Sequence, residues 1–197
     1  YTANTNYQVT VLPGDFEIKT ASIQGASLRA EGGSWPYDGY AHAAQAAVSG
    51  ADGYKILYYT EGGTWSEDSP TVTNVADGTK SVSVKAVREG YEDLTTNNVT
   101  IQITPRDAVI TVKDAWKYFD DPDPAFEGSV SNLVAAGDLG DISYSRTNKD
   151  EDVDIYKEVL TADYTPNTNY NVDIVKGDFE IKTATITGAE LKASGGS

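Results

Sequence analysis

The chain has 197 residues, with 15 basic and 30 acidic side chains, one histidine, no cysteine and no methionine, so its formal net charge is −15. The negative charge argues against nucleic acid and anionic lipid as partners, because acidic surfaces repel both. The lack of cysteine excludes disulfides, thiolate nucleophiles and cysteine-ligated zinc, and no apolar run approaches the roughly 20 residues that cross a bilayer, so we expect no membrane insertion.

The residue mix predicts a mostly β protein. Thirteen tyrosines, together with many valines, isoleucines and threonines, favour strands, and 18 glycines supply turns between them. A chain of this length fits one or two ordinary domains, and the composition indicates that both would be built from sheets.

The segment 1–34 is repeated in residues 164–197. The two copies align without a gap at an offset of 163 residues and differ at 11 of 34 positions, mostly by mild exchanges such as Val11 for Ile174. A period of this length exceeds the roughly 20–50 residues of a solenoid unit and fits a pair of domains of roughly 80 residues each. We therefore expect the chain to span slightly more than one period of a long array.

Residues 20–104 are predicted to form the first complete domain, an immunoglobulin-like β-sandwich of about seven strands. Tyr54–Tyr59 is apolar on both faces, as expected for a central strand, whereas Ser81–Val87 alternates apolar and polar residues, as a half-buried strand does. Further strands are expected at Ser22–Ala30 and Val99–Ile103.

Residues 105–182 are predicted to form the second complete domain, which is β-rich with room for one short helix at Ser129–Ala136, and hence all β or α+β. It begins at Pro105–Asp107, which we interpret as a short, stiff linker. Lys176-Gly177-Asp178 is a turn signal that predicts a hairpin between its two flanking strands. The strands expected in this domain are Val109–Val112, Ile142–Arg146, Tyr170–Ile174 and Asp178–Ile181.

The two remaining segments are predicted to be parts of neighbouring repeats. Because residues 1–19 copy residues 164–182, we interpret them as the final strands of a preceding repeat, and residues 183–197 as the first strand of a following one. Strands with unpaired edges seek partners. We therefore expect strand exchange, in which these segments add to the sheets of neighbouring molecules or swap with their own copies.

Several motifs in residues 107–182 resemble the MBG domain family. They are Ile110–Val112, Lys117–Phe126 (KYFDDPDPAF), Gly137-Asp138, Asn169-Tyr170 and Gly177–Ile181 (GDFEI). The family usually has tyrosine-glycine-aspartate before its Asp-Pro-Ala, whereas Phe119-Asp120 replaces the glycine step here, so the local turn is expected to differ. Residues 1–18 are similar to the final strands of the same family.

A second resemblance lies in the first complete domain. Residues 35–42 (WPYDGYAH) resemble the Tyr-Asp-Gly motif of Ig-like repeats that alternate with MBG domains in Gram-positive bacteria. Together the resemblances imply a secreted protein of the bacterial cell surface, attached to the cell wall through other regions. They also imply an elongated tandem arrangement, in which an Ig-like sandwich is followed by an MBG-type domain and neighbouring repeats are its partners.

Calcium is the metal that the acidic runs favour. Asp120, Asp121 and Asp123 lie close together, and Asp150–Asp154 forms a second run. Hard cations take carboxylate and carbonyl oxygens, and crowded carboxylates repel one another unless they are neutralised. Neither run has the Asp-x-Asp-x-Asp-Gly spacing of a dedicated calcium loop, so the alternative is that both are solvated turns without a cofactor.

The large aromatic residues are the candidates for ligand binding. Exposed rings on one face line many glycan-binding surfaces, whereas buried rings fill the space between two sheets. The sequence does not decide between these two roles. The candidates are Trp35, Trp65, Tyr58, Tyr59 and Trp116.

The chain is not expected to be an enzyme. A hydrolytic triad would need His42 as its base, because the sequence contains no other histidine, and no pair of acids stands in a distinctive context. The function predicted from the resemblance is that of a non-catalytic spacer in the extended stalk of a bacterial adhesin. The alternative is a repeat that itself binds host glycan or glycoprotein through many weak contacts.

Overall fold

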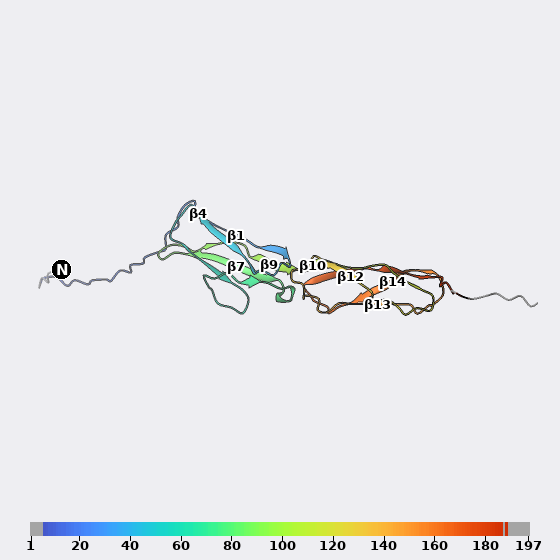
Figure 1. Ribbon diagram of the computed structural model, residues 1–197. Coiled ribbons are helices and arrows are strands. Elements are labelled where there is room, and N and C mark those ends of the chain that lie inside the picture. The colour runs from blue at the N-terminus through green and yellow to red at the C-terminus, as the bar shows by residue number, and fades with distance from the viewer. Residues whose placement is uncertain (1–5, 187, 189–197) are drawn as a thin grey trace, which may run out of the picture.

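The computed structural model describes residues 6–186 and residue 188. In this part of the chain the regular structure is almost entirely strand, which confirms the prediction of a mostly β protein. The strands form two units that lie end to end, the first in residues 21–104 and the second in residues 106–182 (Figure 1). Among the described residues, no helix is long and apolar enough to span a membrane.

The first unit contains nine strands and one short 3-10 helix. Strand β2 pairs with β9 in parallel, and β9, β7 and β5 continue the same sheet in antiparallel order, with β8 beside β7. The pairs β1–β4 and β3–β6 form two further small sheets. The elements are β1 (Ser27–Glu31), β2 (Gly33–Pro36), β3 (His42–Ala43), β4 (Gln45–Ser49), β5 (Lys55–Tyr59), β6 (Thr71–Val72), η1 (Val75–Asp77), β7 (Lys80–Val87), β8 (Leu94–Thr95) and β9 (Val99–Thr104).

The strand predicted to be central in this unit is instead the outermost strand of its sheet. β5 pairs along its length with β7, and its other edge has a single bridge, between Tyr58 and Ser66. The strand is apolar on both faces because Ile56 and Tyr58 pack against the core, while the neighbouring Tyr59 contacts Trp65 from the loop that follows. A loop, and not another strand, therefore lies beside this edge.

The second unit is a two-layer sandwich. One sheet has the order β12-β10-β15, and the other has the order β11-β16-β14-β13. Strand β10 pairs with β15 in parallel, and β11 pairs with β16 in parallel. The strands are β10 (Arg106–Val112), β11 (Ala115–Tyr118), β12 (Gly128–Ser131), β13 (Ser143–Arg146), β14 (Ile155–Asp163), β15 (Tyr170–Val175) and β16 (Gly177–Lys182).

Two local predictions for this unit are wrong, and the predicted linker is shorter than expected. Lys176 does not connect a hairpin, because β15 and β16 belong to different sheets and the chain crosses from one layer to the other there. Residues 129–136 form no helix, since the segment begins with strand β12 and continues as turns. The predicted linker Pro105–Asp107 is reduced to Pro105, because β9 ends at Thr104 and β10 begins at Arg106.

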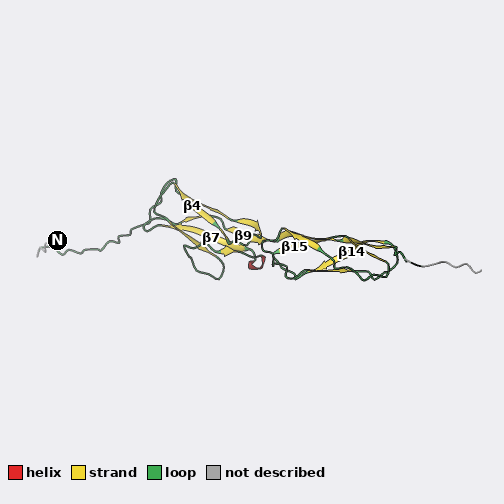
Figure 2. Cartoon of the chain, in the orientation of Figure 1, coloured by secondary structure: helices red, strands yellow, loops and turns green. Residues whose placement is uncertain are grey.

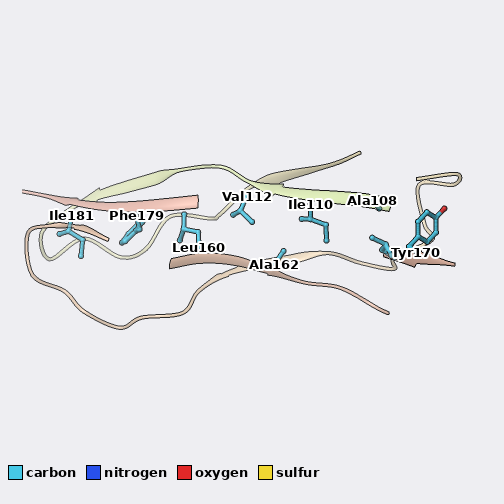
Figure 3. Close-up of a cluster of buried hydrophobic side chains, with 9 residues drawn as sticks. Ala108, Ile110, Val112, Leu160, Ala162, Tyr170, Phe179 and Ile181 are labelled. Atoms are coloured by element: carbon cyan, nitrogen blue, oxygen red, sulfur yellow. The ribbon is translucent and has the colours of Figure 1, made fainter. Parts of the chain in front are cut away.

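The core of the second unit lies between its two sheets (Figure 3). Ile110 and Val112 project from β10, Leu160 and Ala162 lie opposite them on β14, and Phe179 and Ile181 of β16 continue the same row. Phe179 is fully buried, and the ring of Phe126 meets it edge-on at 5.6 Å between centroids. The cluster consists of Ala108, Ile110, Val112, Leu139, Leu160, Ala162, Tyr170, Phe179 and Ile181.

The segments outside the two units contain no strand among their described residues. Residues 7–20 precede the first unit, and the first backbone pairing after them is a bridge between Ala21 and Tyr91. Residues 183–186 and 188 follow the second unit. The remainder of the strand predicted in residues 183–197, and the start of the segment 1–19, lie outside the described residues.

Candidate functional site at the junction of the two units

The two units are joined through continuous backbone pairing on either side of Pro105. On one side the amide of Tyr37 donates to the carbonyl of Thr104 at 2.9 Å, which extends the parallel pairing of β2 with β9. On the other side the amide of Arg106 donates to the carbonyl of Asn169 at 2.9 Å, just before β15 pairs with β10. The proline fixes φ and cannot donate a hydrogen bond, so the connection is short and stiff.

Asn169 of the second unit is buried and binds the first unit through both ends of its side-chain amide. Its Oδ1 accepts the backbone N–H of Val75 at 2.9 Å, and its Nδ2 donates to Oδ1 of Asn74 at 3.0 Å. Val75 begins the 3-10 helix η1, which lies at the boundary between the two units (Figure 2). The first amides of a helix lack partners within the helix, and Asn169 supplies one from the other unit.

Tyr37 and Tyr170 make the apolar part of the same junction. Their rings meet edge-on with 5.5 Å between centroids, and Tyr37 packs against the hydrophobic cores of both units. The hydroxyl of Tyr170 donates to the Asp138 carboxylate and accepts the amide of Val134 at 2.8 Å. Burial and this carboxylate raise the pKa of Tyr170, so its hydroxyl stays protonated and keeps donating at neutral pH.

The guanidinium of Arg106 also bridges the units. Its Nε donates to the carbonyl of Asn132 at 2.9 Å in the second unit, and one terminal nitrogen lies 3.4 Å from the carbonyl of Tyr37 in the first. Gly39 is close to Val134, since a Cβ at Gly39 would lie 3.1 Å from that side chain. Hydrogen bonds and ring packing therefore act together to hold one orientation of the two units.

A second polar cluster contains Asp123, one of the three aspartates from which calcium was predicted, and Glu151 of the second acidic run. Asp123 lies with Oδ1 at 3.0 Å from Lys117 Nζ and Oδ2 at 3.1 Å from Arg146 Nε, and Glu151 pairs with both cations. Lys117 is only 6% exposed. Hydrogen bonds from Lys117 and Arg146 lower the pKa of Glu151, and its bond to Glu151 raises the pKa of Lys117.

The structure does not bring Asp120, Asp121 and Asp123 together as a set of ligands. Asp123 turns toward the two cations, while Asp120 adopts a left-handed φ of 70° in the turn closed by the amide of Asp121 and the carbonyl of Tyr118. The turn lies where the MBG motif usually has a glycine. Aspartate tolerates the left-handed region better than most residues. Among the described residues, no group of three or more acidic or histidine side chains is placed to hold a metal ion.

The five aromatic candidates do not form one surface. Trp35 and Tyr58 pack against the core of the first unit, and the ring centroids of Tyr59 and Trp65 lie 5.4 Å apart. Trp116 belongs to the second unit, where it is 51% exposed. The sequence could not separate these roles, because adjacent residues of a strand point to opposite faces.

Trp116 is the candidate with the most open setting. Its ring meets that of Tyr118 edge-on at 5.4 Å, and Lys182 Nζ lies 4.2 Å from its centroid. Beside it is a shallow groove, lined by Asp114, Ala115, Trp116, Ile155, Asp178 and Glu180. Aromatic and acidic side chains therefore share this part of the surface.

His42 is held by a contact within its own turn. Its Nε2 lies 3.0 Å from Asp38 Oδ2, and its ring stacks on Trp35 with 4.6 Å between centroids. Asp38 also accepts the amide of Tyr40 at 2.9 Å, and this bond, together with His42, lowers the pKa of its carboxyl. The pair fixes the shape of the Tyr37–His42 turn.

One comparison with known proteins identifies part of the chain. Residues 108–180 match the family described as the MBG domain, YGX type. The matched region runs from β10 into β16, so it includes the core of the second unit except Ile181. It also includes the cluster of Lys117, Asp123, Arg146 and Glu151, and Asn169 of the junction. A search of curated proteins gave no match to the chain.

Sequence reasoning missed the contacts of the junction. Asn169 was noticed only as part of a motif, although the same Asn-Thr-Asn-Tyr run occurs at Asn4–Tyr7 and Asn167–Tyr170 in both copies of the repeat. The identity of this run in both copies was the available signal that it has a structural role, since six nearby positions of the same repeat differ. The partners Asn74 and Val75 carry no signal, because they are turn residues far away in the sequence.

Proposed function

We propose that this chain is a non-catalytic spacer repeat from the extended stalk of a bacterial cell-surface adhesin. The observation that carries the proposal is the junction, where buried Asn169 binds Asn74 and Val75 across the boundary. A spacer must keep successive domains in line, and a one-residue connection with a packed, hydrogen-bonded boundary does so.

The MBG match supports the surface location, because this family is often found in surface proteins. The net charge of −15 supports the extended shape, since like charges along a rod repel one another and keep it soluble. In this proposal the Ig-like unit and the MBG unit alternate, and the stalk carries a binding region away from the cell wall.

Single-molecule force spectroscopy tests the mechanical role. Pulling the chain by its ends should give two separate unfolding events, each releasing roughly 25 nm of extended chain. Antibodies raised against the purified chain should label intact cells of the bacterium that makes it, and surface proteolysis should abolish the labelling. Labelling that requires lysed cells would contradict the surface role.

A second candidate function rests on the exposed pair Trp116 and Tyr118. Their rings form an aromatic corner beside the acidic groove of the second unit, and aromatic faces of this kind bind sugar rings. A glycan array probed with the chain and with Trp116→Ala tests it. Binding that the substitution abolishes would favour direct glycan recognition over a spacer role, and an array without binding would remove this candidate.

A further inference from the structure

Residues 7–19 repeat the sequence of strands β15 and β16, but they are not part of a sheet. They align with Tyr170–Lys182 without a gap, and Tyr7, Phe16 and Ile18 stand where the second unit has the same residue types. In the structure this segment contains no strand. The same side-chain pattern therefore occurs once inside a sandwich and once outside it.

The burial of the two copies differs sharply. Tyr7, Phe16 and Ile18 are 72%, 89% and 86% exposed. Their counterparts Tyr170, Phe179 and Ile181 are 6%, 0% and 1% exposed. Exposed aromatic and aliphatic side chains that repeat at alternate positions are the pattern of a strand whose core face has no cover.

Gly14 gives an independent indication of what the segment fits. Its counterpart Gly177 lies against the backbone between β10 and β11, where a Cβ would be 2.8 Å from the carbonyl oxygen of Lys113. Neither glycine has a left-handed φ, so neither is needed for a turn. Nothing lies within 4 Å of a Cβ placed on Gly14. Gly14 therefore suits a close approach to another backbone, which residues 7–19 do not make within this structure.

We propose that residues 7–19 are a strand pair that completes an MBG-type sandwich whose other strands are equivalent to β10–β14. In the second unit β15 pairs with β10, and β16 lies between β11 and β14. The pair thus enters both sheets at once, one strand in each layer. The partner is an MBG-type unit without its own last two strands, as in a neighbouring repeat.

A second copy of this chain is a poorer partner. In a second copy, the positions beside β10 and between β11 and β14 are already filled by β15 and β16, which a short connection attaches to the same unit. Exchange would replace one set of strands by a nearly identical set, so it would gain no buried surface while it cost the entropy of association. The proposal goes beyond the stalk function and holds whether or not the protein acts at a cell surface.

The test adds the missing strands to the full chain. Residues 105–163 are fused directly before Tyr1, so that Asp163 is followed by Tyr1 as it is followed by Tyr164 in the second unit. Amide hydrogen exchange is then compared between this fusion protein and the unextended chain. We expect the amides of residues 8–11 and 16–18 to exchange at least about 100-fold more slowly in the fusion protein, because paired core strands open only rarely.

Three variants of the fusion protein provide the controls. Gly14→Val should abolish the protection, since a side chain there meets the β10–β11 backbone, and Phe16→Asp should do the same. Thr10→Asp should keep it, because Asp173 occupies the equivalent exposed position in β15. Neither the Gly14 nor the Phe16 variant should change the melting of the unextended chain, which separates loss of docking from loss of folding.

Two results would overturn the proposal. One is a fusion protein in which residues 8–18 exchange as fast as in the unextended chain. The other is an unextended chain that protects these amides by forming a concentration-dependent dimer, which would make a second copy the partner. Neither result depends on the stalk function, and force spectroscopy of the unextended chain would test that function separately.

Discussion

The side-chain oxygen of Asn169 lies 2.9 Å from the backbone nitrogen of Val75, and this bond joins two units that have separate hydrophobic cores. Val75 itself packs against the core of the first unit. The orientation of the second unit is thus coupled to a packed element of the first, and not only to the intervening proline.

Asn169→Ala should loosen the junction without unfolding either unit. The substitution leaves the Val75 amide without its partner, which should weaken the association of the two units by about 1–3 kcal/mol of free energy. Residual dipolar couplings check this, since one alignment tensor should fit both units of the wild type and two should be needed for the variant. Asn171→Ala is the control, because that exposed side chain bonds only Asp107 in the same unit. A single tensor for Asn169→Ala would show that the junction is held by other contacts.

Acid should destabilise the second unit through Glu151. Its pKa is lowered from 4.5 by hydrogen bonds from Lys117 and Arg146, so at mildly acidic pH the unfolded chain binds more protons than the folded one. The stabilisation is fully present above pH 4.5 and is lost as pH falls through the lower folded value. Melting temperatures between pH 6 and pH 3 should therefore fall.

Glu151→Gln tests the assignment of this acid dependence. It should lower the melting temperature at pH 6 and reduce its further decline toward pH 3, because the titrating carboxyl is gone. Glu127→Gln is the matched control, since Glu127 pairs with Lys113 at the surface and such pairs contribute little. An unchanged decline in Glu151→Gln would assign the acid sensitivity to other carboxyls, of which Asp178 also has a lowered pKa.

The strands that sequence alone could predict are those whose burial alternates. Ser81–Val87 was recognised because β7 buries every second residue, and β10 shows the same pattern. The failures concern both elements and partners: the long strand β14 (Ile155–Asp163) was not predicted, and a helix was expected at residues 129–136, where none forms. The turn at Lys176 is real, but turn chemistry carries no information on whether the next strand stays in the same sheet, so the crossover to the other layer was predicted as a hairpin.

The junction and the charge cluster escaped prediction for a similar reason. Asn169 becomes a buried bridge only because Asn74 and Val75 fold beside it from the other unit. Asp123 belongs to an acidic run in the sequence, yet its neighbours in space are the cations Lys117 and Arg146. The run of acidic residues in the sequence predicted a metal ion, whereas the folded chain places basic side chains beside Asp123.

The two copies of one phenylalanine should respond differently to the same substitution. Phe179→Ala removes a fully buried ring and should cost about 3–5 kcal/mol of the stability of the second unit. Phe16→Ala removes a ring that is 89% exposed and should change stability by less than about 0.5 kcal/mol. Denaturant unfolding followed by tryptophan fluorescence measures both, because Trp35 and Trp65 report on the first unit and Trp116 on the second. A large loss in Phe16→Ala would mean that this segment already packs within the chain.

Calcium should not stabilise the wild-type chain. For Asp123 to bind the ion, its carboxylate would have to leave Lys117 at 3.0 Å and Arg146 at 3.1 Å, and the gain from coordination would be offset by the loss of these pairs. The melting temperature should therefore be the same in millimolar calcium and in excess chelator. Lys117→Met removes one competing cation and leaves Asp123 and Glu151 underneutralised, so calcium should protect this variant more than the wild type. A calcium-dependent rise of several degrees in the wild type would instead favour the acidic run Asp120–Asp123 as a metal site, because ligand that binds the folded state raises its melting temperature.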